Sequence, residues 1–167
     1  MKIQIGSLSE GTHQYHFEVH PTDIELGEGF AGPVNVDATL EKTGKQFFLK
    51  ARIQAAGSFI CDRCTARFDL ALSPEYRMFY VPDEADAGGF DPSEVQVIPA
   101  GLPIIDLAED VRQTVLLAVP LKLLCRPDCK GICPQCGADL NSEPCTCPAE
   151  GTDARWEGLR GLRPEGN

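Results

Sequence analysis

Eight cysteines occur in this 167-residue chain, and six of them lie within its last third. They fall into four close pairs: Cys61/Cys64, Cys125/Cys129, Cys133/Cys136 and Cys145/Cys147. Thiolates two or three residues apart can converge on one tetrahedral ion, because a tight turn points both sulfurs the same way. Pro134 presets such a turn, and Gly137 lets the backbone fold beneath the sulfurs. The stretch from Cys125 to Cys147 therefore predicts a metal-binding knuckle.

Four thiolates complete a closed structural zinc site, so two zinc ions account for all eight cysteines. The preferred pairing places Cys61, Cys64, Cys125 and Cys129 on one ion and Cys133, Cys136, Cys145 and Cys147 on the second. The alternative is a single ion held within residues 125–147, with the other thiols free. Only Ile132 and Leu140 are large apolar residues in that segment, so the metal is expected to fold it. Iron would also suit four thiolates, but nothing in the sequence requires it.

The composition is that of a globular protein in a reducing compartment. Hydrophobic residues make up 43% of the chain, and no apolar run follows Met1-Lys2 as a secretory signal would. The longest apolar run, Val115 to Leu121, contains Pro120 and is far too short to span a bilayer. We therefore expect a cytoplasmic protein without membrane contact, in which cysteines bind metal rather than form disulfides.

Alternating apolar and polar residues predict an α+β fold, mainly an antiparallel β-meander packed by one helix and extended by a C-terminal zinc ribbon. The clearest strands cover residues 34–41, 47–55 and 68–72, with weaker signals at 2–8, 15–19, 76–81 and 94–98. The pair Cys61/Cys64 lies in the turn between the last two clear strands. A helix is expected over residues 106–119, with Asp106 as its N-cap, Glu109 completing a capping box and Pro120 ending it.

These signals predict three regions. Residues 1–120 form the β domain with its helix, residues 121–147 form the zinc-binding segment docked on it, and residues 148–167 form a largely disordered tail. Residues 82–92 are expected to form an exposed loop.

The net charge of −10 disfavours non-specific binding to nucleic acid. Its distribution is uneven, because residues 81–110 contain eight acids and no lysine or arginine. An outward patch of Phe48, Lys50, Arg52 and Arg67 is a candidate RNA contact, with phosphate-binding cations and a stacking aromatic ring. The alternative interpretation is that this patch is an ordinary solvent-exposed sheet face. His13, His16 and His20 are interpreted as surface residues.

The sequence contains no signature of an enzyme or of a small-molecule substrate site. A catalytic zinc keeps an open position with His or carboxylate nearby, and no histidine follows His20. Phosphate-binding glycine loops and nucleophile elbows are absent from the sequence. A thiol redox role would need a βαβ context, whereas the predicted strands form a meander.

Three segments together resemble the YceD-like family of large ribosomal RNA subunit accumulation proteins. They are Cys61-Asp-Arg-Cys64, the helix from Asp106-Leu107 to Val-Pro120-Leu, and Cys125-Arg-Pro-Asp-Cys-Lys-Gly-Ile-Cys-Pro-Gln-Cys-Gly-Ala-Asp-Leu-Asn141. The resemblance implies a non-enzymatic ribosome biogenesis factor whose partner is large-subunit rRNA or a ribosomal protein. The alternative is an acidic binding module or chaperone for a basic ribosomal protein, using the loop at 83–94.

Overall fold

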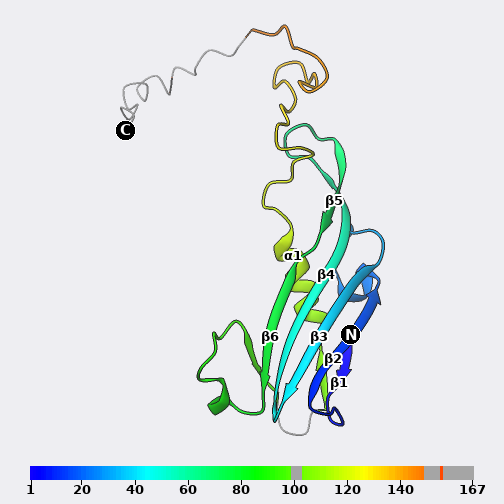
Figure 1. Ribbon diagram of the computed structural model, residues 1–167. Coiled ribbons are helices and arrows are strands. Elements are labelled where there is room, and N and C mark those ends of the chain that lie inside the picture. Colours follow the sequence, from blue (N-terminus) through cyan, green and yellow to red (C-terminus); the bar gives the residue numbers. More distant parts are fainter. Residues whose placement is uncertain (99–102, 149–154, 156–167) are drawn as a thin grey trace.

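A computed structural model describes residues 1–98, 103–148 and 155 of the chain (Figure 1). A six-stranded sheet forms its body, with β2 (Gly11–Val19), β3 (Val34–Thr43), β4 (Gln46–Ile60), β6 (Glu75–Val81) and β7 (Val95–Val97) in that order. The sixth strand, β5 (Arg67–Leu72), pairs with β4 alone. A second, two-stranded sheet joins β1 (Lys2–Gln4) to β8 (Ile104–Asp106). The remaining elements are the helix α1 (Ala108–Ala118) and the short 3-10 helices η1 (Pro21–Ile24) and η2 (Glu84–Ala87).

The length of β4 determines where the candidate site lies. Its first half pairs with β6 through residues 47–52, and its second half pairs with β5 through residues 55–60. The strand that returns along β4 is interrupted between β5 and β6 at Pro74, because proline has no N–H to donate to a neighbouring strand. As a result, the β4–β5 hairpin continues beyond the main sheet as a two-stranded ribbon (Figure 1). Its turn carries Cys61 and Cys64.

The antiparallel pairing predicted for the three clearest strands is confirmed by the register of β3 with β4 and of β4 with β5. The predicted extension by β6 is also present, antiparallel to β4. The weak strand signal at 94–98 corresponds to β7, but β7 lies parallel to β6. The sheet is therefore mixed at this edge, because the acidic loop carries the chain back along β6 before β7 begins.

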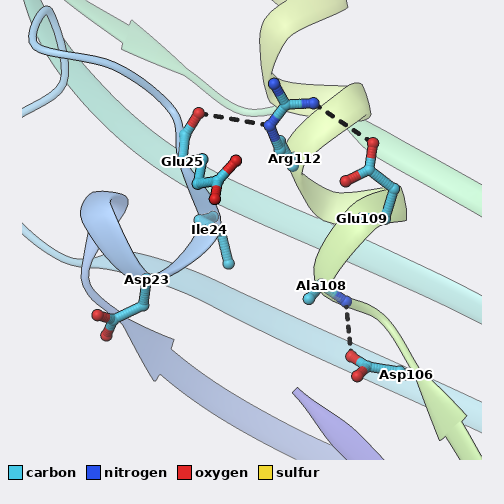
Figure 2. A pocket seen from close by; sticks show the side chains of 7 residues that line it. All are labelled: Asp23, Ile24, Glu25, Asp106, Ala108, Glu109 and Arg112. Carbon is cyan, nitrogen blue, oxygen red and sulfur yellow. Dashed lines mark hydrogen bonds and ion pairs between the residues drawn. The ribbon is translucent and has the colours of Figure 1, made fainter.

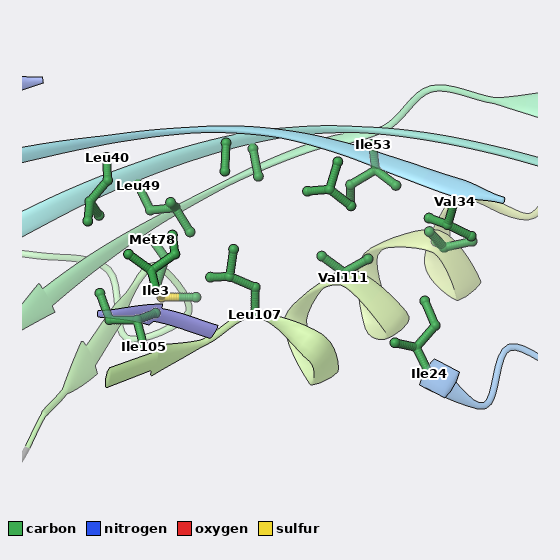
Figure 3. Packing of buried hydrophobic residues seen from close by; sticks show 14 of the residues in the cluster. Ile3, Ile24, Val34, Leu40, Leu49, Ile53, Met78, Ile105, Leu107 and Val111 are labelled. Carbon is green, nitrogen blue, oxygen red and sulfur yellow. The ribbon is translucent and has the colours of Figure 1, made fainter. Parts of the chain in front are cut away.

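One apolar core fills the space between the inner face of the sheet and α1 (Figure 3). The strands contribute every second residue, such as Val36, Leu49 and Ile53, each fully buried. The helix contributes Val111 and Val115, four residues apart and also fully buried. The two-stranded sheet closes the same core with Ile3 and Ile105. This core fixes where α1 ends, and so where the cysteine-rich segment begins.

The start of the helix differs from the sequence prediction. Asp106 is the last residue of β8, paired with Lys2, and the capping position is Leu107. The Asp106 carboxylate still accepts a hydrogen bond from the Ala108 N–H at 3.0 Å, so it satisfies one free donor of the first turn. Glu109 bonds the side chains of Arg112 and Gln113, so the predicted capping box is wrong. Pairing with β1 holds the backbone of Asp106 extended, so the helix begins later in the chain than the sequence predicted.

The expectation of a disordered tail at 148–167 lies outside the described residues, apart from Pro148 and Arg155. The division of the chain at residue 120 stays a prediction.

Two tyrosines on β6 allow a matched test of the core. The hydroxyl of Tyr76 is buried and has no hydrogen-bond partner among the described residues, whereas the Tyr80 hydroxyl donates to Asp110 Oδ2 at 3.4 Å. Tyr76→Phe removes an unpaired polar group and should raise the free energy of unfolding by about 1 kcal/mol. Tyr80→Phe removes a hydrogen-bond partner of Asp110 and should lower the free energy of unfolding by about 1 kcal/mol. Urea denaturation measures both, and equal losses would contradict this description of the core.

Candidate metal centre

The first group of cysteines joins two segments that are distant in sequence. Cys61 and Cys64 lie on the turn of the β4–β5 ribbon, and Cys125 and Cys129 lie on the segment that follows α1. Their four sulfurs all lie within 4.8 Å of one another. The Sγ–Sγ distances are 3.8 Å for Cys61–Cys129 and 3.6 Å for Cys64–Cys125. A tetrahedral zinc with bonds of about 2.3 Å would separate its sulfurs by about 3.8 Å, so this group fits such an ion.

Two hydrogen bonds, one between backbone groups and one to a side chain, hold these two segments together beside the sulfurs. The Asp62 N–H donates to the Leu123 carbonyl at 2.8 Å, and the Leu123 N–H donates back to Asp62 Oδ2 at 2.6 Å. Within the turn, Thr65 adopts a left-handed backbone with φ +59°, and its N–H donates to the Cys61 carbonyl at 2.9 Å. Phe68 and Leu124 pack against the group. The first group is therefore mostly buried, with Cys61 only 1% exposed.

The second group lies in the next loop of the chain and is more open to solvent. Its members are Cys133, Cys136, Cys145 and Cys147, whose sulfurs also lie within 4.8 Å of one another. The Cys133 N–H donates to the Ala138 carbonyl at 2.8 Å, and the Gly137 N–H donates to the Cys133 carbonyl at 2.9 Å. Gly137 has φ +75°, as a knuckle turn requires. Cys136 is exposed.

The predicted zinc ribbon has only a small counterpart in secondary structure. Within residues 103–148, the cysteine-rich segment contains one isolated bridge, Ile132 with Asp139. The tight turn at Cys133–Gly137 is present, while metal binding there and a ribbon built of strands stay predictions.

The environment shifts the pKa values of Cys61 and Cys125, two thiols of the first group, in opposite directions. Burial raises the pKa of Cys61, but N–H groups of Cys125, Cys64 and Arg63 outweigh it and bring that pKa to about 6. Burial, followed by the neighbouring thiols of its group, raises the pKa of Cys125 to about 12. A cation among the sulfurs would favour the ionised form of the Cys125 thiol.

The second group shows the same division. Backbone N–H groups of Cys136 and Gln135 lower the pKa of Cys133 to about 6. The adjacent thiols of Cys145 and Cys136 raise the pKa of Cys147 to about 12. Both groups could each hold a metal ion, and all eight cysteines are free of disulfides. The structure thus brings together the two sets that the preferred pairing named.

The outward cations of the sheet are engaged with a residue that sequence reasoning missed. Glu75 on β6 pairs with Arg52 at 2.8 Å and with Lys50 at 3.4 Å. The hydrogen bonds from Arg52 and then Lys50 hold the pKa of Glu75 below its usual range. Arg52 and Glu75 are direct cross-strand partners, so their ion pair could be predicted only from the register of β4 with β6. Lys50 and Arg52 are thus brought together, but their charge is partly neutralised.

Of the other two residues of the expected RNA patch, Phe48 shares the outer face of β4 with Lys50, whereas Arg67 lies at the far end of the ribbon. Phe48 stacks on Phe79 with ring centroids 4.6 Å apart, and Phe79 contacts Phe90 at 4.4 Å. Phe48 is therefore half-buried in a stack that fastens the acidic loop to the sheet. Arg67 pairs in register with Ile60, eight residues along β4 from Arg52, so it lies near the end of the ribbon. The structure does not bring Arg67 into the patch.

Two further polar features lie away from the cysteine groups. A shallow cavity of about 440 Å³ lies between η1 and the start of α1 (Figure 2). There Arg112 pairs with Glu109 at 3.3 Å and donates to the Glu25 carbonyl at 3.3 Å. On the outer face, His16 Nδ1 lies 2.8 Å from Asp37 Oδ1.

No described helix is long and apolar enough to cross a membrane.

Comparison with known proteins gives one family and several relatives. Residues 49–163 match the family described as Large ribosomal RNA subunit accumulation protein YceD. An uncharacterized protein of Mycobacterium tuberculosis is 32% identical over 131 residues, which are 75% of this chain and 60% of that protein. The chloroplastic large ribosomal RNA subunit accumulation protein YCED homolog 1 of Arabidopsis thaliana is 31% identical over 160 residues, covering 80% of this chain and 49% of that protein. The chain thus spans about half to three fifths of the length of these relatives. No solved structure matches it significantly.

Two glycines of the cysteine-rich segment test how closely the groups are packed. A Cβ at Gly131 would lie 3.0 Å from the Arg63 carbonyl oxygen, and its φ is +80°. Gly137 has a similar φ of +75°, but a Cβ there would meet nothing within 4 Å. Gly137→Ala should cost about 1 kcal/mol from backbone strain alone, and Gly131→Ala should cost more because the carbonyl must move.

Hydrogen exchange at the Ile132 amide, which donates to the Arg63 carbonyl at 3.2 Å, reports this difference. For each 1.4 kcal/mol of local stability that a variant loses, exchange at this amide should be roughly tenfold faster. We expect this acceleration in Gly131→Ala and not in Gly137→Ala. The same acceleration in both variants would contradict the close approach.

Proposed function

The chain belongs to the YceD family of large ribosomal RNA subunit accumulation proteins, and from this membership we propose that it is a ribosome biogenesis factor. It supports the accumulation of large-subunit rRNA in the cytoplasm without catalysing a reaction. The observation that carries the proposal is the extent of the family match. Residues 49–163 include most of β4, the ribbon turn, α1 and both cysteine groups, so the matched region contains the site and its supports.

Each cysteine group holds one zinc ion with a structural role. Sulfur spacings near those of a tetrahedral site, together with the divided thiol pKa values, support this assignment. Four protein ligands leave no open position for a substrate or an activated water, which supports a non-enzymatic role. Zinc binding can contribute on the order of 10 kcal/mol to folding a segment with almost no core of its own. The first ion would fasten the segment after α1 to the β4–β5 ribbon.

The contact with the pre-ribosome is the second element of the proposal, and two surfaces compete for it. Lys50 and Arg52 share Glu75, which reduces their availability for rRNA phosphates. The acidic loop carries Glu84 and Asp86, whose carboxylates have no cationic partner among the described residues. Phe90 holds this loop against Phe79 instead of leaving it free. These observations favour contact with a basic segment of a ribosomal protein, which is the second candidate function.

Metal removal tests the structural role of zinc. Purified chain should contain two zinc ions and no iron, as measured by elemental analysis. Chelation should speed amide exchange throughout residues 121–147, because that segment loses the ions that fold it. Amides of the core strands, such as Val36 and Ile53, should stay protected, since they depend on apolar burial. Full protection of residues 121–147 in metal-free protein would refute the structural role.

Depletion and rescue test the function and its surface together. Cells depleted of the chain should show a lowered ratio of large-subunit to small-subunit rRNA, and wild type should restore it. Glu84→Gln with Asp86→Gln should weaken association with precursors roughly tenfold through lost electrostatic attraction and should fail to rescue fully. The matched control, Lys50→Gln with Arg52→Gln, should rescue.

The opposite pattern would assign the contact to the sheet face and to rRNA. An unchanged rRNA ratio on depletion would remove the proposed function itself.

A further inference from the structure

Asn141 belongs to the loop of the second cysteine group but contacts the first. It lies between Cys136 and Cys145 in sequence, yet its Nδ2 donates to Cys129 Sγ at 3.5 Å. Its Oδ1 accepts from the Lys130 N–H at 2.8 Å and from the Arg126 guanidinium at 2.8 Å. Cys129 is a member of the buried first group. One amide side chain from the loop of the second group therefore reaches a sulfur of the first group.

The orientation of this amide is fixed by its partners. Nδ2 also donates to Asp139 Oδ1 at 2.7 Å, so both of its hydrogens are used. A reversed amide would place oxygen against the Cys129 sulfur and the Asp139 carboxylate, and nitrogen against two donors. The network therefore determines that the Cys129 sulfur receives a hydrogen-bond donor.

The turn that carries Asn141 is built from the second loop. The Asn141 N–H donates to Asp139 Oδ1 at 2.9 Å, and Ser142 Oγ donates to Asp139 Oδ2 at 2.9 Å. The Leu140 N–H donates to the Gly131 carbonyl at 3.0 Å. Ligands of the second group flank this turn on both sides, so an ion bound there would limit its movement.

The two groups also differ in their access to solvent. Cys61 is 1% and Cys129 2% exposed, whereas Cys136 of the second group is exposed. Metal exchange with solvent should therefore begin at the second group. A change at that site would reach the first through Asn141 and through the short link from Cys129 to Cys133.

We infer that the two cysteine groups act as one coupled two-metal unit, in which Asn141 is the positioning residue that links their occupancies. The inference rests on the proposed zinc binding. An ion in the second group holds the 139–142 turn, and the turn presents Asn141 to Cys129. The N–H donor offsets negative charge on the metal-bound thiolate and strengthens the first site. By thermodynamic linkage, the first ion must then strengthen the second by the same factor.

The test measures the two affinities separately. Full-length protein is loaded with ¹¹³Cd²⁺, whose NMR signal distinguishes two four-sulfur sites, and a chelator competes for the metal. Cys136→Ser identifies the resonance of the second group by removing one of its ligands. In wild type, the chelator should remove the resonance of the first cysteine group only after it has removed that of the second group.

Four variants test the coupling as a cycle. Asn141→Ala should lower the cadmium affinity of the first group about tenfold, the low end of the effect of losing an outer-shell partner. Cys136→Ser should lower that affinity similarly, and the double variant should lower it no further than either single change. Glu143→Gln is the matched control, because the exposed Glu143 side chain makes no hydrogen bond or ion pair among the described residues and its backbone N–H still donates to the Asp139 carbonyl, and it should leave this affinity unchanged.

Asn141→Asp guards against a simple folding defect. Aspartate keeps the acceptor for the Lys130 N–H but replaces the donor with a negative oxygen, so it should weaken the first site at least as much as Asn141→Ala. A first-site affinity that is unchanged in both Asn141 variants, or additive losses in the double variant, would overturn the inference while leaving zinc binding intact. Wild-type protein that binds no metal would overturn the zinc proposal and the inference with it.

Discussion

The convergence of thiols from the ribbon turn and from the segment after α1 is the contact on which the cysteine-rich end depends. Cys61 and Cys129 are 68 residues apart in the chain, yet their sulfurs lie 3.8 Å apart. Little apolar surface is available to hold them there, since Phe68 and Leu124 are the main hydrophobic neighbours. The clustered sulfurs and the reciprocal Asp62–Leu123 hydrogen bonds take the place of a hydrophobic core at this point, and the proposed zinc ion would fasten them together.

The body of the protein supplies the rigid elements that make this convergence possible. β4 is one continuous strand that serves the main sheet with its first half and the ribbon with its second. The core beneath it also holds α1, so both parts of the cysteine site start from the same packed unit (Figure 3). A structural change in the core would therefore alter the spacing between the ribbon turn and the segment after α1.

The outer face of the sheet has a different character from the cysteine-rich end. Residues of opposite charge face one another across its strands, with His16 beside Asp37 on β2 and β3, and Arg52 beside Glu75 on β4 and β6. Such cross-strand pairs satisfy the charges locally and leave little net attraction for a polyanion. The acidic loop, held down by the Phe48–Phe79–Phe90 stack, carries Glu84 and Asp86 without a cationic partner among the described residues. This charge distribution would suit the proposed contact with a basic protein better than broad electrostatic binding to RNA.

Local patterns in the sequence determined the features that depend on neighbouring residues. The alternation at 34–41 and 47–55 identified the strands and their buried faces, and the spacing of the cysteines identified the knuckles, because side-chain direction follows from backbone period. Only the tertiary structure decided which distant groups meet. It set β7 parallel to β6, separated Arg67 from Lys50 and Arg52, and placed Asn141 against Cys129. Each of these depends on strand register and on how the chain returns over long separations, and a sequence read in local windows contains neither.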